Sequence, residues 1–101
     1  MRQFSNYVAL DLETTGLNPF TDDIIEVALV KVREGKITEQ FSSFVFTPLQ
    51  ISQHVSYLTG ITAKDLEGAP DFISLLPKLQ ELIGDNPILG HNIFFDWSFL
   101  M

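Results

Sequence analysis

Two acids in an apolar stretch near the N-terminus have the clearest potential for chemistry. Asp11 and Glu13 alternate with Leu10 and Leu12 in residues 8–16. In a strand, the two leucines would enter a core while both carboxylates share the other face, with their Cα atoms about 6.6 Å apart. Such carboxylates repel each other unless a cation lies between them, and the divalent ions used in phosphoryl chemistry would fit. The alternative is a pair of solvated acids on an edge strand.

A third acid lies in the second stretch of chemical interest, residues 90–100. Asn92 is a good helix N-cap, and the segment that follows is largely apolar around Asp96. Asp96 would lie one turn into this helix, and an acid buried there needs a cationic partner. Neither Lys nor Arg occurs after Lys78. A metal ion shared with the two strand acids would satisfy all three carboxylates; an exposed helix acid is the alternative.

The elements that must position these acids begin with a sheet. Residues 24–32 form a β-branched run that predicts a strand buried on both faces and paired with the first. Residues 33–36 predict a tight connection, and residues 37–46 predict a hairpin partner at the sheet edge. Glu26 is an acid within the second strand. We expect it to be a hydrogen-bonded structural residue, with a supporting role at the metal site as the alternative.

The loop after the first strand lies beside the two acids. Its sequence contains Thr14, Thr15 and Gly16, then Leu17 and an Asn-Pro pair, which is typical of a turn. Backbone amides there could bind a terminal phosphate or hydroxyl of a substrate, and Leu17 could contact a base. The alternative is that Thr15 and Gly16 only shape the turn.

Helical segments follow the sheet. Ser52 can cap a short helix that Gly60 ends, and residues 62–65 have the spacing of a capping box. His54 has no second ligand nearby, so we expect a surface residue. Residues 72–83 have one apolar face, which predicts a helix packed on the sheet with a bend or break at Pro77. Residues 85–87 predict a turn, and residues 88–90 a short inner strand.

Composition limits the class of protein. The 101 residues allow at most one domain, and 46% are hydrophobic, which indicates a folded chain. The sequence has no cysteine, so a metal must be held by oxygen or imidazole, and an oxygen site suits Mg²⁺ or Mn²⁺. The net charge of −7 leaves no basic stripe for nucleic acid, so bound metals and backbone amides would have to attract phosphates. We find no signal peptide or membrane span and expect a cytoplasmic protein.

Four blocks, in this order, resemble the DnaQ-like 3′–5′ exonucleases of the DEDD superfamily. They span nearly the whole chain, and a Thr occurs at position 59 where several relatives have His. The resemblance implies a ribonuclease H-like α/β fold, a mixed sheet flanked by helices. The blocks are Asp11-Leu12-Glu13-Thr14-Thr15-Gly16-Leu17, Asp23-Ile24-Ile25-Glu26, Leu58-Thr59-Gly60-Ile61-Thr62, and Gly90-His91-Asn92 with Phe95-Asp96.

The resemblance also implies an activity, which is the removal of nucleotides from the 3′ end of DNA by hydrolysis with two metal ions, Mg²⁺ or Mn²⁺. RNA is an alternative substrate. The attached partner would be a DNA polymerase, as in the proofreading part of DNA polymerase III, or a helicase. By the same resemblance, Asp11, Glu13 and Asp96 would be the catalytic metal ligands. The substrate contacts would be Thr14, Thr15, Gly16, Leu17, His91, Asn92 and Phe95.

The family's third motif, a His or Tyr general base with a fourth Asp, has no counterpart in residues 1–101. We therefore expect residues 1–101 to be the N-terminal part of a single exonuclease domain. Alone, this chain should bind metal weakly, hydrolyse DNA very slowly or not at all, and self-associate through its apolar C-terminal helix. A non-catalytic nucleic-acid-binding or polymerase-assembly module with the same fold is the alternative function.

Overall fold

A four-stranded mixed sheet is the framework of the molecule. The computed structural model describes residues 6–16, 18 and 22–90. The strands lie in the order β3-β2-β1-β4; β1 pairs antiparallel with β2 and parallel with β4, and β2 pairs antiparallel with β3. The elements in chain order are β1 (Tyr7–Thr14), β2 (Ile24–Arg33), β3 (Lys36–Phe44), α1 (Gln53–Thr59), the 3₁₀ helix η2 (Ala63–Leu66), α2 (Phe72–Ile83) and β4 (Ile88–Gly90).

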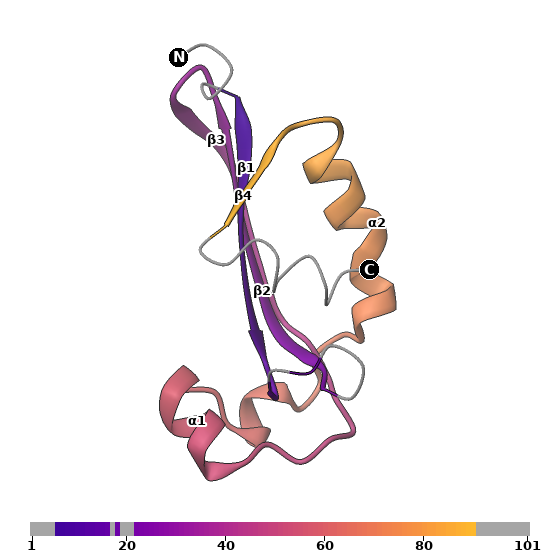
Figure 1. Cartoon of the computed structure of the whole chain (residues 1–101). Helices are drawn as coiled ribbons and strands as arrows, with labels where there is room; N and C mark the ends of the chain where they lie inside the picture. Colours follow the sequence, from indigo (N-terminus) through magenta and orange to yellow (C-terminus); the bar gives the residue numbers. More distant parts are fainter. Residues whose placement is uncertain (1–5, 17, 19–21, 91–101) are drawn as a thin grey trace.

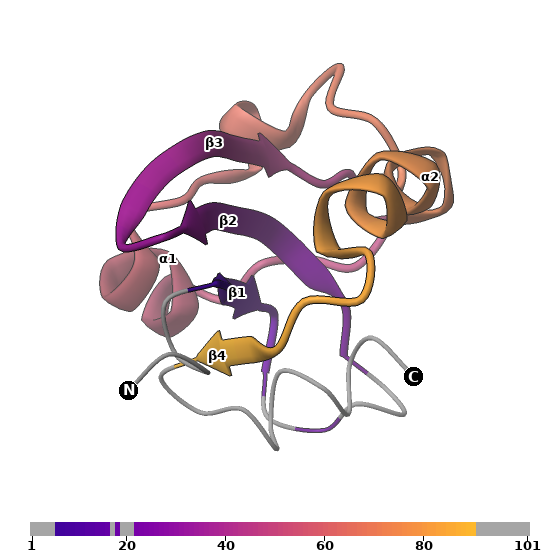
Figure 2. The same cartoon turned by 90° about the horizontal axis from the view of Figure 1, so that it is seen from above.

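One face of this sheet and helix α2 enclose the main core. Val8, Leu10 and Leu12 of β1 are all buried, as the alternating pattern predicted, while Asp11 between them is exposed. Val27 and Leu29 of β2 extend the same apolar face. Helix α2 lies along this face (Figures 1 and 2), and the three residues that it buries in the core are Leu75, Leu79 and Leu82.

The opposite face of β2 differs from the sequence prediction. This strand was expected to be buried on both faces, but Glu26, Ala28 and Val30 are only half-buried. The prediction was wrong because helix α2 covers only the face that carries Val27 and Leu29. At the start of the strand, the register with β1 shifts between Glu13 and Thr14. Ile25 therefore leaves the main core and packs in a second cluster with Ile61 and Leu66.

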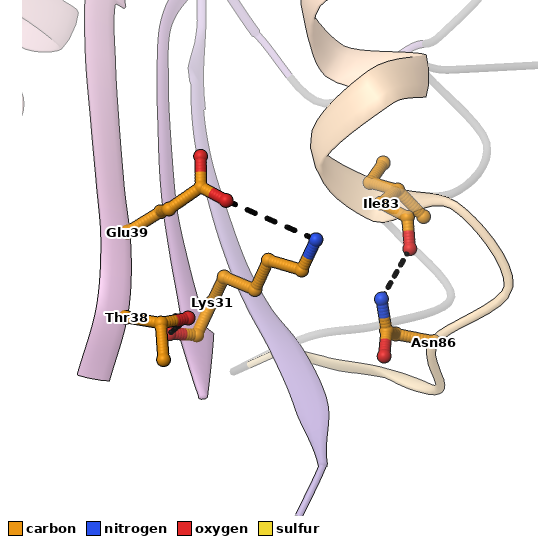
Figure 3. Close-up of polar contacts among 5 residues, drawn as sticks. All are labelled: Lys31, Thr38, Glu39, Ile83 and Asn86. Atoms are coloured by element: carbon orange, nitrogen blue, oxygen red, sulfur yellow. Dashed lines mark hydrogen bonds and ion pairs between the residues drawn. The ribbon is translucent and has the colours of Figure 1, made fainter. Parts of the chain in front are cut away.

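A tight turn joins β2 and β3, as predicted. Glu34 and Gly35 both have positive φ, 53° and 74°, which is the backbone of a two-residue hairpin turn of type I′. Figure 3 shows two contacts that accompany this pairing. The Lys31 ammonium lies 4.0 Å from the Glu39 carboxylate, and the Thr38 hydroxyl donates a 3.3 Å hydrogen bond to the Lys31 carbonyl. In this sheet β3 is an edge strand, which confirms the prediction.

The caps of the short helices are also as predicted. The Ser52 hydroxyl accepts a hydrogen bond from the Val55 amide at the start of α1, and Gly60 ends the helix with φ of 77°. Thr62 and Asp65 form a reciprocal capping box at η2. Helix α1 lies at the end of the sheet where β1 terminates (Figure 1) and buries none of its own residues fully.

Helix α2 continues through Pro77, so the break allowed by the prediction is wrong, while the alternative of a bend stays a prediction. Its buried leucines lie on both sides of Pro77 along one face, and their packing stabilises the helix despite the missing amide hydrogen bond. After the helix, the Asn86 side-chain amide donates a 2.9 Å hydrogen bond to the Ile83 carbonyl (Figure 3), and the chain enters β4. In the described part of the chain, no helix is both long and apolar enough to span a membrane.

Candidate functional site

Three carboxylates lie on the sheet face away from α2. Asp11 lies opposite Ala28 in the antiparallel register, and Glu13 lies opposite Glu26. Residues directly opposite each other share a face, so Glu26 lies on the same face as the two acids of β1. Asp11 is exposed, whereas Glu13 and Glu26 are half-buried. Strand β1 therefore places Asp11 and Glu13 on the same face, as the alternation predicted, and Glu26 of the neighbouring strand β2 adds a third acid to this face.

Burial raises the pKa of Glu26, and the negative charge of Asp11 raises it further. In the described part of the chain, no hydrogen bond or ion pair reaches the Glu26 carboxylate, so the hydrogen-bonded structural role expected for it stays a prediction. The sequence pattern suggested an ordinary buried acid with a polar partner. The structure places Glu26 instead among like charges, where a cation would stabilise its ionised form.

The carboxylates fit a divalent metal ion as an incomplete set of ligands. Oxygen donors of this kind suit Mg²⁺ or Mn²⁺. Among the residues that the structure describes, however, no group of three or more His, Asp or Glu side chains converges on a common point. Asp11 and Glu13 would thus be two ligands of a larger set. Asp96, the third ligand expected from the sequence, lies outside the described residues.

The loop after β1 is organised by Asp22, which the sequence analysis did not single out. The Thr15 hydroxyl donates to Asp22 Oδ1 at 3.1 Å and accepts from the Asp23 amide at 2.9 Å. The Asn18 amide donates to Asp22 Oδ2 at 3.1 Å. A Cβ atom on Gly16 would lie 2.4 Å from Asp22 Oδ2, so any side chain at this position would force the Asp22 carboxylate to move. These contacts support the turn-shaping alternative for Thr15 and Gly16.

A second contact ties this loop to the segment after β3. The Thr47 hydroxyl, which is buried, donates a 2.5 Å hydrogen bond to Asp23 Oδ2 and accepts one from the Leu49 amide. Asp23 belongs to the second of the blocks that carry the family resemblance. The carboxylates of the adjacent residues Asp22 and Asp23 therefore both connect the loop after β1 to other parts of the chain.

A hollow of about 380 Å³ lies between the end of β1 and helix α1. On the β1 side, the lining residues are Glu13, Thr14 and Gly16. Thr14 and Gly16 were among the predicted substrate contacts. The wall from α1 was missed by the sequence analysis. Leu58 of this wall is an apolar residue at the surface, with 66% of it exposed. The residues of this wall are His54, Val55, Leu58 and Thr59.

Both threonine hydroxyls that line the hollow donate their protons to backbone carbonyls. Thr14 donates to the Gly16 carbonyl at 2.6 Å, and Thr59 donates to the Val55 carbonyl at 2.9 Å. His54 is exposed, as predicted, but lies beside the acids rather than on a remote surface. The remaining predicted substrate contacts, Leu17, His91, Asn92 and Phe95, lie outside the described residues.

Residues 8–101 match the profile of an exonuclease family, RNase_T. The chain is 43% identical over 94 residues to the PolC-type DNA polymerase III of Bacillus subtilis, and 38% identical over 94 residues to that of Clostridium perfringens. Each alignment covers 93% of this chain but only 6% of the polymerase, so the chain corresponds to a small part of these relatives. The family match confirms the resemblance drawn from the sequence blocks.

Solved exonuclease structures have the same fold. Exonuclease X in complex with 5′ overhanging duplex DNA has a TM-score of 0.79 and 28% identity, and the match covers 92% of this chain and 52% of that one. Exonuclease I of E. coli, in complex with a dT13 oligonucleotide, has a TM-score of 0.80 at 19% identity, over 94% of this chain and 22% of that one. The predicted ribonuclease H-like mixed sheet flanked by helices is therefore confirmed.

Proposed function

Because the chain belongs to the exonuclease family, we propose that it carries part of a metal-dependent 3′–5′ exonuclease site that removes nucleotides from the 3′ end of DNA. The observation that carries this proposal is the placement of Asp11 and Glu13 on one sheet face, with Glu13 also lining the hollow beside α1. Glu13 thus belongs both to the proposed metal ligands and to the lining of a space large enough for a nucleotide.

Each part of the site has a distinct role in the proposed reaction. Asp11 and Glu13 hold divalent ions, Mg²⁺ or Mn²⁺, and bound ions of this kind activate a water and stabilise the leaving oxygen of a phosphodiester. The exposed Leu58 and the neighbouring Val55 give an apolar wall for the terminal base or sugar. Asp22 keeps the loop after β1 in place beside this wall. The expected third ligand Asp96 and the contacts from residues 91–95 remain predictions.

The chemistry of the hollow favours a single unpaired nucleotide over a duplex. Its volume of about 380 Å³ is enough for one nucleotide, and its α1 wall is apolar rather than basic. With a net charge of −7, the chain has little general attraction for a phosphate backbone. Binding should therefore depend on the terminal nucleotide and on metal ions. We propose single-stranded DNA as the substrate, with RNA as the alternative, and attachment to a polymerase because the PolC-type relatives are polymerases.

We further propose that residues 1–101 form the N-terminal part of one exonuclease domain. Support comes from the match to exonuclease X, which covers 92% of this chain but only 52% of that one. The isolated chain should then bind metal weakly and cut DNA very slowly or not at all. A purified chain that degrades single-stranded DNA with Mn²⁺, at a rate that Asp11→Ala abolishes, would contradict this part of the proposal.

Metal titration tests the site itself without depending on turnover. Isothermal titration with Mn²⁺ should give a measurable affinity that Asp11→Asn lowers by about tenfold, since one charged ligand is lost. Glu34→Gln removes the same charge from the exposed β2–β3 turn and should leave the affinity nearly unchanged. Equal effects of both substitutions would show only general charge attraction and would count against a site at β1. Metal-independent DNA binding that is unaffected by Asp11→Asn would favour the non-catalytic module.

A further inference from the structure

The hollow beside α1 has few hydrogen-bond donors to offer a ligand. Both threonine hydroxyls that line it, Thr14 and Thr59, donate to backbone carbonyls. Glu13 can only accept when ionised, and Val55 and Leu58 have no polar side-chain atoms. Among the described residues that line the hollow, His54 is the one whose side-chain N–H makes no hydrogen bond to another described residue.

Such a donor would stabilise a phosphate bound at this hollow, in addition to the metal ions proposed at Asp11 and Glu13. Phosphate oxygens are acceptors, and the neighbouring carboxylates of Glu13 and Asp11 repel them. The residues that line the hollow include neither lysine nor arginine. An imidazole at the rim can supply a hydrogen bond in either its neutral or its charged form.

The position of His54 is fixed by the start of α1. Ser52 caps the helix through its 3.1 Å hydrogen bond with the Val55 amide, so the backbone around His54 is set by a defined turn. The adjacent residue Gln53 is equally exposed but does not line the hollow. The helix therefore directs His54, and not its polar neighbour, toward the space between α1 and β1.

We propose that His54 is a substrate-binding residue, which donates a hydrogen bond to the phosphate of the nucleotide held in this hollow. The inference rests on the proposed function and adds to it a contact that neither the sequence blocks nor the metal ligands supply. His54 was expected to be an ordinary surface residue, and it is not a metal ligand in this proposal. Its role is to bind the nucleotide phosphate next to the carboxylates of Asp11 and Glu13.

Nuclear magnetic resonance titration of the chain with thymidine 5′-monophosphate in the presence of Mg²⁺ tests the contact. His54→Phe keeps a planar ring but removes the N–H donor, and it should weaken nucleotide binding by about tenfold, the value of one charge-assisted hydrogen bond. His54→Gln retains a donor and should bind within about twofold of the original chain. Gln53→Ala is the matched control from the same turn and should have no effect. Thymidine, which lacks the phosphate, should bind the original chain and His54→Phe equally.

The outcomes separate the two proposals. If the amide signals of Val55, Leu58 and Thr59 do not move when nucleotide is added, the hollow is not the nucleotide site, and the proposed function fails there together with this inference. If these signals move but His54→Phe binds as tightly as the original chain, only the role of His54 is overturned. Equal weakening of thymidine and its monophosphate by His54→Phe would place the histidine on the sugar or base and would refute the phosphate contact.

Discussion

Replacing Glu26 with glutamine should stabilise the protein at neutral pH. Glu26 lies directly opposite Glu13 and on the diagonal from Asp11. Diagonal partners in a sheet lie about 7–8 Å apart, where two unit charges in water repel by about 0.5 kcal/mol. The directly opposite pair adds a similar amount, within the range of about 0.2–1 kcal/mol for cross-strand pairs. Glu26→Gln should therefore raise the free energy of unfolding by about 1 kcal/mol.

The pH dependence of this gain follows from the direction of the pKa shift. Burial first and Asp11 second raise the pKa of Glu26 above its usual value of 4.5 in the folded protein. As the pH rises, Glu26 therefore loses its proton in the unfolded chain at a lower pH than in the folded protein. Between the unfolded and the folded pKa of Glu26, the folded state loses stability relative to the unfolded state. Below the usual pKa both states are protonated and the cost is absent. The advantage of Glu26→Gln should be full near pH 7 and should disappear by about pH 4.

Thermal unfolding followed by circular dichroism measures this difference. At pH 7 the substitution should raise the melting temperature by about 4–8 °C, the shift that corresponds to about 1 kcal/mol in a domain of this size. Glu34→Gln, in the exposed β2–β3 turn, controls for the change in net charge. High salt should reduce the gain because part of the repulsion is screened. A gain that persists unchanged at pH 4, or that Glu34→Gln reproduces, would refute the electrostatic explanation.

Three further substitutions test the local structure, each by urea unfolding. Gly16→Ala should destabilise the protein by about 1–3 kcal/mol, because its Cβ would lie 2.4 Å from the Asp22 carboxylate; stability equal to that of the original chain would contradict the close approach. Pro77→Ala should stabilise by about 2 kcal/mol, since the helix already runs through this position and regains an amide donor; a loss of stability would mean that the ring itself packs usefully. Thr62→Ala should cost about 1 kcal/mol by breaking the capping box with Asp65, and a neutral result would show that η2 does not depend on its cap.

Features set by local periodicity or local hydrogen bonds were predictable from the sequence. The alternation around Asp11 and Glu13 determined which face of β1 enters the core, because a strand has no other way to separate two leucines from two acids. The caps at Ser52 and Gly60 followed from side-chain chemistry and backbone freedom within a few residues. Such signals act over one turn or one strand, so tertiary contacts had little opportunity to override them.

Features that depend on segments distant in the sequence were not predictable. The wall of the hollow joins α1 to a strand that ends some forty residues earlier, and nothing around His54 or Leu58 indicates which surface they face. A break at Pro77 was expected because local propensity disfavours a helix there, but packing of leucines against the sheet outweighs that cost and the helix continues. The ionic surroundings of Glu26 likewise required the strand register.

The arrangement of the proposed metal ligands explains why metal and nucleotide should depend on each other here. Asp11 and Glu13 come from one strand, and in the described residues no third ligand meets them. Mg²⁺ is usually held by one or two carboxylates together with waters and substrate phosphates, so a phosphate in the adjacent hollow would supply ligands that the described protein residues do not. Any gain in metal affinity on adding nucleotide must equal the gain in nucleotide affinity on adding metal, because linkage is reciprocal. The acid face and the hollow should thus behave as one binding site, in which neither ligand is held tightly without the other.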